Sequence, residues 1–279
     1  MQENWLLFTI IAGVSSVAFN TYNRGTLKAG HDSTVYAWLF ELIRCIFFAL
    51  LIPFGYYLVA TPKNILTLVL LGLSELVGVY LYMKMHAVTE LSVSSIISRF
   101  RVISLPIFAF IFLGERLSML QYVGIMAIFT GCLVVVGMKH VRGTKGIWYA
   151  LGFVLVNSLS TVLMKSASST ASIAIVNTAF SLPAAVLIPA IMKNSLSRIH
   201  LTVKPILKST LFASAFNILT MYCLVRAYQL ASASQVNSVF QGVTSLAVVV
   251  GIMLFNEHDH KLLKVIGALL TTLGIILLV

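Results

Sequence analysis

Charged side chains are scarce in this sequence. Lys, Arg, Asp and Glu together make up 10% of the 279 residues, whereas 59% are hydrophobic. An ordinary soluble domain is about half apolar and about a quarter charged. The composition therefore excludes a water-soluble globule or a disordered chain and predicts an integral membrane protein. The longest polar stretch, from Lys193 to about Pro205, is too short to form a soluble domain.

Several chemical signatures are also missing. The 3 cysteines lie within apolar runs, so we expect no disulfide framework. The sequence has no G-x-x-x-x-G-K-[ST] loop, which excludes ATP binding by that route. The segment Glu257-His258-Asp259-His260 contains metal-ligating residue types but lacks the spacing of a known zinc site. We therefore expect neither a cofactor nor a metal, and no enzymatic activity.

Acidic residues are fewer than basic ones. The sequence has 19 Lys and Arg against 8 Asp and Glu, a net charge of +11. In a chain this apolar, basic residues at helix ends contact lipid phosphates and set orientation, so we expect membrane lipids and not nucleic acid as partners. Basic residues concentrate after odd-numbered apolar runs, above all at 139–145 and 193–208. The positive-inside rule then places these connections in the cytoplasm and both chain ends outside.

Apolar runs separated by polar breaks predict an all-α polytopic protein with ten transmembrane helices. The expected helices span 5–22, 34–59, 64–85, 91–113, 118–138, 146–166, 171–192, 206–230, 234–256 and 262–279. The first run begins behind Glu3, without a basic leader or a small-residue cleavage site, so we expect it to be a retained helix.

The chain also contains an internal repeat. A shift of 142 residues aligns Tyr80 with Tyr222, Lys84 with Arg226, Ser92 with Ser234, and Glu115 with Glu257. One inserted residue later, Gly124 meets Gly267 and Gly131 meets Gly274, and the same shift of 143 aligns Trp5 with Trp148. Residues 1–142 and 143–279 thus read as two five-helix units. Because five is odd, the second unit is inverted in the membrane, which is the architecture of many secondary transporters.

Polar residues in the predicted spans recur at repeat-related positions. Glu75 shares a helix face with Tyr82, and Arg99 lies on a stripe of the next helix. The shift of 142 places Asn217 opposite Glu75, Gln241 opposite Arg99, and Asn237 opposite Ser95. Ionisable groups in a bilayer mark functional sites, so we expect a central substrate cavity lined by these six residues.

Two other interpretations of these residues stay open. A Glu75–Arg99 ion pair would hold the helices together without any ligand, and the small polar residues would serve as packing contacts between helices. If Glu75 is not permanently paired, it is a candidate coupling residue that exchanges a proton for substrate. Arg99 or Arg101 would suit an anionic substrate, although Arg101 lies two residues further round the helix and is assigned to a helix interface.

Other ionisable residues are given structural roles. Glu41 and Arg44 are three residues apart and are expected to form an intramembrane pair. Glu115 and Glu257 precede the fifth and tenth predicted helices, where a carboxylate caps exposed N–H groups.

These residues carry a family resemblance. The chain resembles the EamA-like branch of the drug/metabolite transporter superfamily in Arg44, Pro106, Glu115, Gly124 and Gly131 of the first half. Glu257, Gly267 and Gly274 match again in the second half, whereas Phe180 replaces Arg44 and Val248 replaces Pro106.

The resemblance implies a central cavity between helices three, four, eight and nine, with Asn20, Asn157 and Ser158 added from helices one and six. It also implies that both chain ends are cytoplasmic, which disagrees with the charge bias. We expect a secondary-active or facilitative transporter of a small polar metabolite, more an exporter than an importer, in a bacterial or archaeal plasma membrane. The chain is expected to be a monomer or homodimer. The alternatives are a membrane-embedded enzyme acting on a lipid or prenyl substrate, and a non-transporting receptor or assembly subunit.

Overall fold

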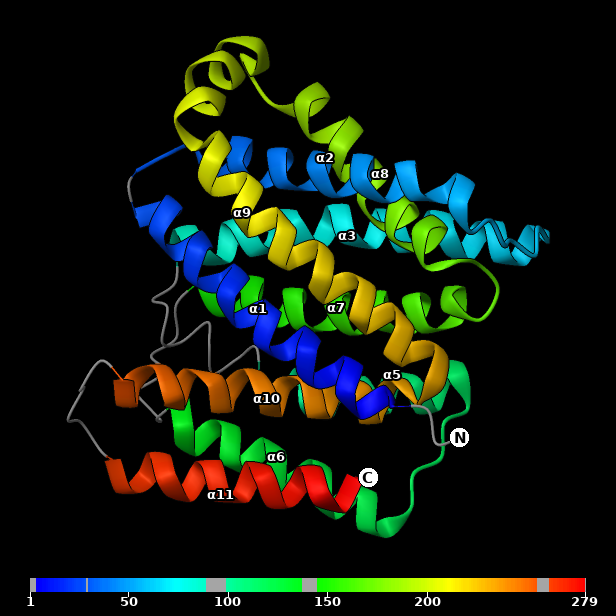
Figure 1. Cartoon of the computed structure of the whole chain (residues 1–279), viewed down its shortest axis with the longest axis vertical. Coiled ribbons are helices and arrows are strands. Elements are labelled where there is room, and N and C mark those ends of the chain that lie inside the picture. Colours follow the sequence, from blue (N-terminus) through cyan, green and yellow to red (C-terminus); the bar gives the residue numbers. More distant parts are fainter. Residues whose placement is uncertain (1–3, 29, 89–98, 137–144, 255–260, 279) are drawn as a thin grey trace.

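The computed structural model describes residues 4–28, 30–88, 99–136, 145–254 and 261–278. Within these residues the chain forms ten α-helices and no strand (Figure 1). The helices are α1 (Trp5–Lys28), α2 (Ser33–Leu51), α3 (Pro62–Val88), α5 (Arg101–Leu113), α6 (Met119–Val136), α7 (Lys145–Ser168), α8 (Ile173–Ile191), α9 (Ser195–Leu230), α10 (Ala233–Leu254) and α11 (Lys261–Leu278). Six are long and apolar enough to cross a membrane, and three shorter helices are also apolar. The predicted all-α polytopic membrane protein is confirmed.

Three helix boundaries differ from the sequence prediction by six residues or more, and the first is the end of α1, which continues to Lys28 rather than ending at 22. The α9 helix begins at Ser195 rather than 206, so the polar stretch 193–205 is largely helical. The α2 helix ends at Leu51 rather than 59 and is followed by a 3₁₀ turn, Ile52–Phe54, which contains Pro53. Proline lacks the backbone N–H that would continue the α-helical ladder, which explains the change. The fourth predicted helix is described only as α5, from Arg101.

Helix contacts follow the two predicted repeats. Numbered in order, the repeats pair α1 with α7, α2 with α8, α3 with α9, α5 with α10 and α6 with α11. The main interfaces come in matching sets under this exchange: α1·α9 with α3·α7, α2·α9 with α3·α8, and α1·α10 with α5·α7. The α2·α8, α5·α10 and α6·α11 interfaces each map onto themselves. The packing supports an approximate two-fold between the repeats, whose boundary at residue 142 lies outside the described residues.

The α6·α11 contact depends on glycine. A Cβ added to Gly124 would lie 2.8 Å from the carbonyl oxygen of Gly274, and one added to Gly131 would lie 2.6 Å from that of Gly267. Since Gly124 is the repeat partner of Gly267 and Gly131 that of Gly274, the two contacts are related by the same exchange. Small residues let two membrane helices pack backbone to backbone, which is what these positions provide.

Asp32 fixes the start of α2. Its carboxylate accepts hydrogen bonds from the amides of Thr34 (3.0 Å) and Val35 (3.3 Å) and two more from Arg198 on α9 (2.6 and 2.8 Å). Partial burial acts to raise the pKa of Asp32, but the hydrogen bonds and charge of Arg198, with those amides, outweigh it and hold the pKa below its ordinary value of 3.8. The pair ties α9 to the α1–α2 connection.

Candidate functional site

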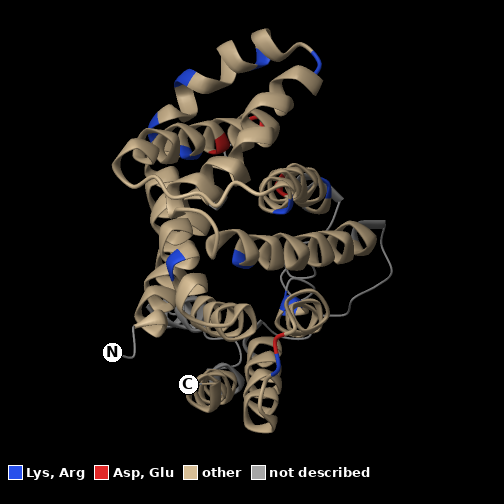
Figure 2. Cartoon of the chain, turned by 90° about the vertical axis from the view of Figure 1, so that its right-hand side faces the viewer, with Lys and Arg blue, Asp and Glu red and all other residues tan. Residues whose placement is uncertain are grey.

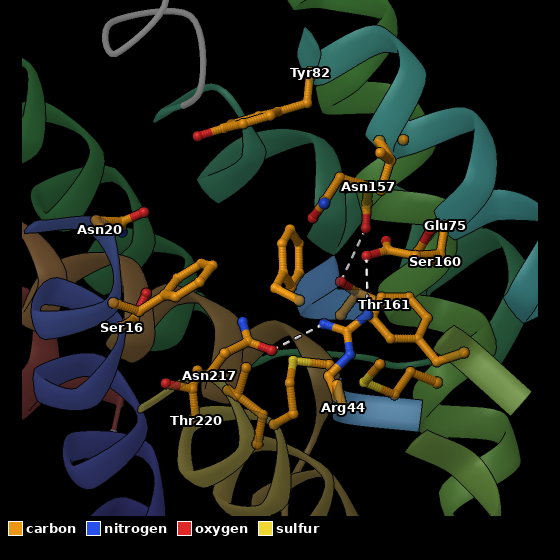
Figure 3. Close-up of a pocket in the computed structure, with 18 of the residues that line it drawn as sticks. Ser16, Asn20, Arg44, Glu75, Tyr82, Asn157, Ser160, Thr161, Asn217 and Thr220 are labelled. Atoms are coloured by element: carbon orange, nitrogen blue, oxygen red, sulfur yellow. Dashed lines mark hydrogen bonds and ion pairs between the residues drawn. The ribbon is translucent and has the colours of Figure 1, made fainter. Parts of the chain in front are cut away.

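The helices enclose a cavity of about 300 Å³ between the two halves (Figure 3). Side chains of α1, α2, α3, α5, α7, α8, α9 and α10 line it. Its polar lining comprises Ser16, Asn20, Asn23, Arg44, Glu75, Arg101, Asn157, Ser160, Thr161, Asn217 and Thr220. Its aromatic lining comprises Phe19, Tyr36, Phe40, Tyr82, Phe153, Phe180, Tyr228 and Phe240. Charged residues are sparse along the ribbon (Figure 2), and three of them, Arg44, Glu75 and Arg101, line this cavity.

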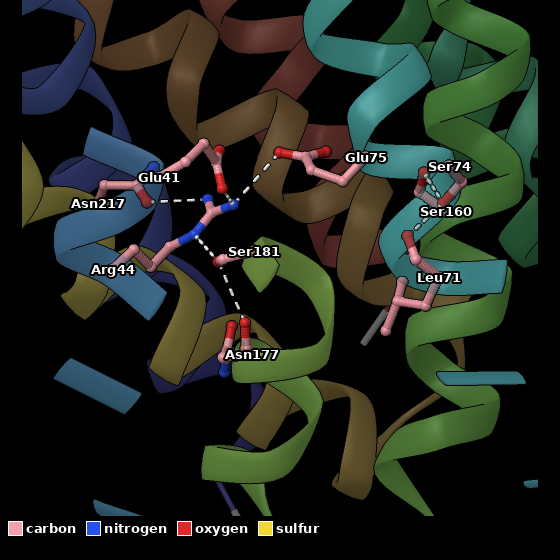
Figure 4. A network of polar contacts seen from close by, with 9 residues as sticks. All are labelled: Glu41, Arg44, Leu71, Ser74, Glu75, Ser160, Asn177, Ser181 and Asn217. Carbon is pink, nitrogen blue, oxygen red and sulfur yellow. Dashed lines mark hydrogen bonds and ion pairs between the residues drawn. The ribbon is translucent and has the colours of Figure 1, made fainter. Parts of the chain in front are cut away.

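Arg44 is the centre of the polar network (Figure 4). Its Nε donates to Ser181 Oγ at 2.6 Å, and one terminal nitrogen donates to Asn217 Oδ1 at 3.1 Å. The other terminal nitrogen contacts both Glu41 Oε2, at 2.5 Å, and Glu75 Oε1, at 3.3 Å. The Glu41–Arg44 pair expected from the sequence is therefore formed, but it belongs to a larger cluster that reaches the cavity wall.

The two carboxylates on Arg44 differ in access. The side chain of Glu41 is fully buried, whereas that of Glu75 is 13% exposed and lines the cavity. Arg44 supplies one positive charge for both carboxylates. Taking up one proton would make this cluster of three groups neutral. The alternative Glu75–Arg99 pair is not formed, because Arg44 is the partner of Glu75.

Repeat-related positions meet at the site. The guanidinium of Arg44 lies over the ring of Phe180, 4.8 Å from its centroid, and Phe180 occupies the position that matches Arg44 in the second half. Likewise Arg99 donates to the side-chain oxygen of its repeat partner Gln241 at 2.9 Å, and to Thr244 Oγ1 at 3.2 Å. Both contacts place these residues next to the approximate two-fold. Each arginine faces a neutral residue, so the two predicted repeats differ in charge at these matching positions.

The structure divides the eight predicted substrate residues into two groups. Five line the cavity: Asn20, Glu75, Tyr82, Asn157 and Asn217. The other three, Arg99, Asn237 and Gln241, are not among its lining residues. Arg99 and Gln241 are hydrogen-bonded to each other, as described above, and the buried Nε of Arg99 has no partner within the described residues. Asn237 is fully buried on α10, and neither of its amide atoms has a hydrogen-bond partner in the described part of the chain.

The structure gives Arg101 a second environment beside the predicted one. Arg101 lies at the interface of α5 and α7, where it donates to Thr161 Oγ1 at 2.5 Å, and it also lines the cavity. Arg99 lies before the start of α5 and contacts α10, whereas Arg101 is the first residue of α5 and contacts α7. The sequence showed this separation but did not fix how the helix is rotated. Ser158, added by the family resemblance, is buried against Ser104 (2.7 Å) instead of facing the cavity.

Comparison with known proteins agrees with this architecture. Residues 3–137 match the model of the EamA-like transporter family. This family is part of the drug/metabolite transporter superfamily, so the resemblance noted from the sequence is confirmed. No curated protein matches the chain. A solved structure titled only "Crystal structure of protein" aligns with a TM-score of 0.72 at 14% identity, covering 97% of this chain and 93% of its own, which shows a shared fold.

Glu115 caps a different helix from the one expected. Its carboxylate accepts hydrogen bonds from the amides of Ala233 (2.6 Å) and Ser234 (3.2 Å) and from Ser234 Oγ (2.8 Å), at the start of α10. The start of α6 is instead held by a reciprocal pair, in which Ser118 N donates to Gln121 Oε1 and Gln121 N donates to Ser118 Oγ. Glu257, the matching residue, lies outside the described residues.

Lys165 holds the same corner from the other side. Its ammonium on α7 donates to the carbonyl oxygen of Tyr228 and, at 2.8 Å, to that of Ala231, where α9 ends. Cations favour the negative end of a helix, as carboxylates favour the positive end. Glu115 and Lys165 therefore clamp the turn between α9 and α10. Tyr228, whose carbonyl oxygen Lys165 holds, also lines the cavity.

Proposed function

We propose that the chain is a secondary-active or facilitative transporter that moves a small polar metabolite across the membrane by alternating access. One observation carries the proposal: a cavity with charged and amide side chains, such as Glu75, Asn157 and Asn217, lies midway along helices from both repeats. Substrate sites of inverted-repeat transporters lie at that depth, between the repeats. The family match supports a transporter of this type. Rocking of one repeat against the other would expose the cavity to each side in turn.

Uptake into sealed vesicles tests the proposal. The purified full-length chain is reconstituted and offered a panel of labelled metabolites of different charge. Asn157→Ala and Thr220→Ala change the cavity lining. Thr130→Ala is the matched control, because Thr130 and Thr220 both bond to the carbonyl four residues earlier, but Thr130 is on an exposed α6 position. We expect about five- to tenfold slower uptake in the cavity variants, as for loss of one hydrogen bond. Equal uptake by all four proteins would contradict the proposal.

We propose further that Glu75 couples transport to protons. It is the more accessible of the two carboxylates that share Arg44, so a proton can reach it from the cavity. Glu75→Gln keeps the shape of the side chain and removes the titration. We expect uptake by this variant to lose its response to a pH gradient; unchanged rate and pH dependence would exclude the coupling role. We propose export as the direction of transport, and a bacterial or archaeal plasma membrane as the location of the protein.

The enzyme and receptor alternatives predict different results. Formation of a product from a lipid or prenyl substrate, without movement of solute, would favour the enzyme. Ligand binding without solute movement in any direction would favour the receptor. The described residues contain no group of three or more His, Cys, Asp or Glu positioned to hold a metal, so they offer no metal site as support for the enzyme alternative.

A further inference from the structure

The cavity contains two arginines in different electrostatic environments. Arg44 has protein acceptors on all three of its nitrogens and two carboxylates against its charge. It also lies over the ring of Phe180. A guanidinium offers five N–H donors, and those of Arg44 are largely taken by the protein. Arg44 is therefore held as part of the wall.

Arg101 is held much less completely. Its only hydrogen bond within the described part of the chain goes to Thr161 Oγ1, and its buried Nε has no partner there. It forms no ion pair with a carboxylate of the described residues. Burial of a cation without a counter-charge is costly, and the cost is removed when an anion with matching acceptors binds. Arg101 thus offers a charge and unused donors on the cavity wall.

The surroundings of Arg101 limit what such an anion can be. Glu75 is the accessible carboxylate of the cavity, and it is committed to Arg44. Of the three charged residues that line the cavity, Arg44, Glu75 and Arg101, Arg101 is the one without an ion pair among the described residues, which suits one negative charge and not two. Aromatic rings, including those of Phe153 and Tyr228, form much of the remaining lining. A volume of about 300 Å³ is at the small end of the range for ligand sites.

We infer that Arg101 binds the carboxylate of the transported molecule, and that the substrate class is small organic monoanions with an apolar, ring-sized body. The inference rests on the proposed transport function and specifies its ligand. A planar carboxylate accepts two parallel N–H bonds from a guanidinium, and the aromatic lining packs against the rest of the molecule. Asn157 and Thr161, both on α7, flank the site as neutral polar groups.

Matched ligands test this inference. Phenylacetate, phenylacetamide, phenethylamine and phenyl phosphate share a ring and differ in charge. Binding to the purified chain is measured by calorimetry, and uptake by reconstituted vesicles. We expect phenylacetate to bind and to be taken up, with the other three at least about tenfold weaker because the buried charge is left unpaired or overcompensated. Arg101→Gln should weaken phenylacetate at least about tenfold, and Arg101→Lys should weaken it less. Arg116→Gln, which removes an exposed arginine, is the control.

The outcomes separate the ligand from the function. Equal binding of the amide or the amine, or full phenylacetate affinity in a folded Arg101→Gln protein, would overturn the carboxylate assignment while leaving transport intact. Tighter binding of phenyl phosphate than of phenylacetate would overturn the monoanion class. Arg101-dependent binding of phenylacetate without uptake would uphold the ligand and contradict the proposed function. Folding of each variant is checked by its helical circular dichroism and elution volume.

Discussion

Replacing Glu115 by alanine removes three hydrogen bonds from the start of α10, two from backbone amides and one from Ser234 Oγ. A hydrogen bond to a charged group contributes about 1.5–3 kcal/mol. Glu115 is only partly buried, and water replaces part of the lost bonding, so we expect a total loss of about 2–4 kcal/mol in the free energy of unfolding. Glu115→Gln retains one acceptor oxygen, and we expect a loss of about 1 kcal/mol.

The assay is reversible unfolding in mixed micelles, followed by circular dichroism, combined with hydrogen exchange. Arg116→Ala changes the neighbouring exposed residue and should stay within about 0.5 kcal/mol of the parent. Ser118→Ala removes the cap of α6 and should cost about 1 kcal/mol without exposing the amides of α10. Exchange at Ala233 and Ser234 should accelerate only in the Glu115 variants. A Glu115→Ala protein as stable as Arg116→Ala, with both amides still protected, would refute the assignment of the cap.

Two further predictions concern packing and pH. Gly131→Ala should lower the melting temperature because its Cβ would lie 2.3 Å from Thr271 Oγ1. Gly152→Ala is the control and should be nearly neutral, because its Cβ would meet only a leucine methyl at 3.6 Å. Equal shifts in melting temperature would contradict the close α6·α11 contact. The pKa of Asp32 in the folded chain is below its ordinary value of 3.8, so ionised Asp32 stabilises the fold fully at pH values above 3.8. That stabilisation is lost as the pH falls from 3.8 through the lower pKa of the folded chain. The melting temperatures of the parent and of Asp32→Asn should therefore converge below about pH 3.8; a constant difference between them would show that the Asp32–Arg198 pair does not titrate as inferred.

Much of the fold was predictable because bilayer thickness imposes a simple rule on sequence. A run of about 20 apolar residues must be a helix, and ten such runs were visible. Recurrent glycines also indicated the repeats, since Gly124 and Gly131 match Gly267 and Gly274 and the same residues meet in the structure. The start of α9 was missed, because the polar residues after Lys193 carry no apolar signal although they form helix.

The site was predictable in part. The helical face of Glu75 correctly included Tyr82, and the repeat added Asn217. The sequence chose Arg99 over Arg101 because Arg99 shares a stripe with other polar residues, but Arg99 faces α10 rather than the cavity. A stripe defines one face of a helix; it does not say which neighbour that face meets.

The sequence by itself determined that the chain is an all-α polytopic membrane protein and which few ionisable groups lie within its apolar runs, and it predicted the internal repeat. The tertiary structure decided which of these groups meet: Arg44 with Glu75, Arg101 with the cavity, and Glu115 with a helix more than a hundred residues away. The reason is physical. Hydrophobic length and local spacing are properties of one segment, whereas the rotation of a helix and the partner of a buried charge are set by packing among all the segments together.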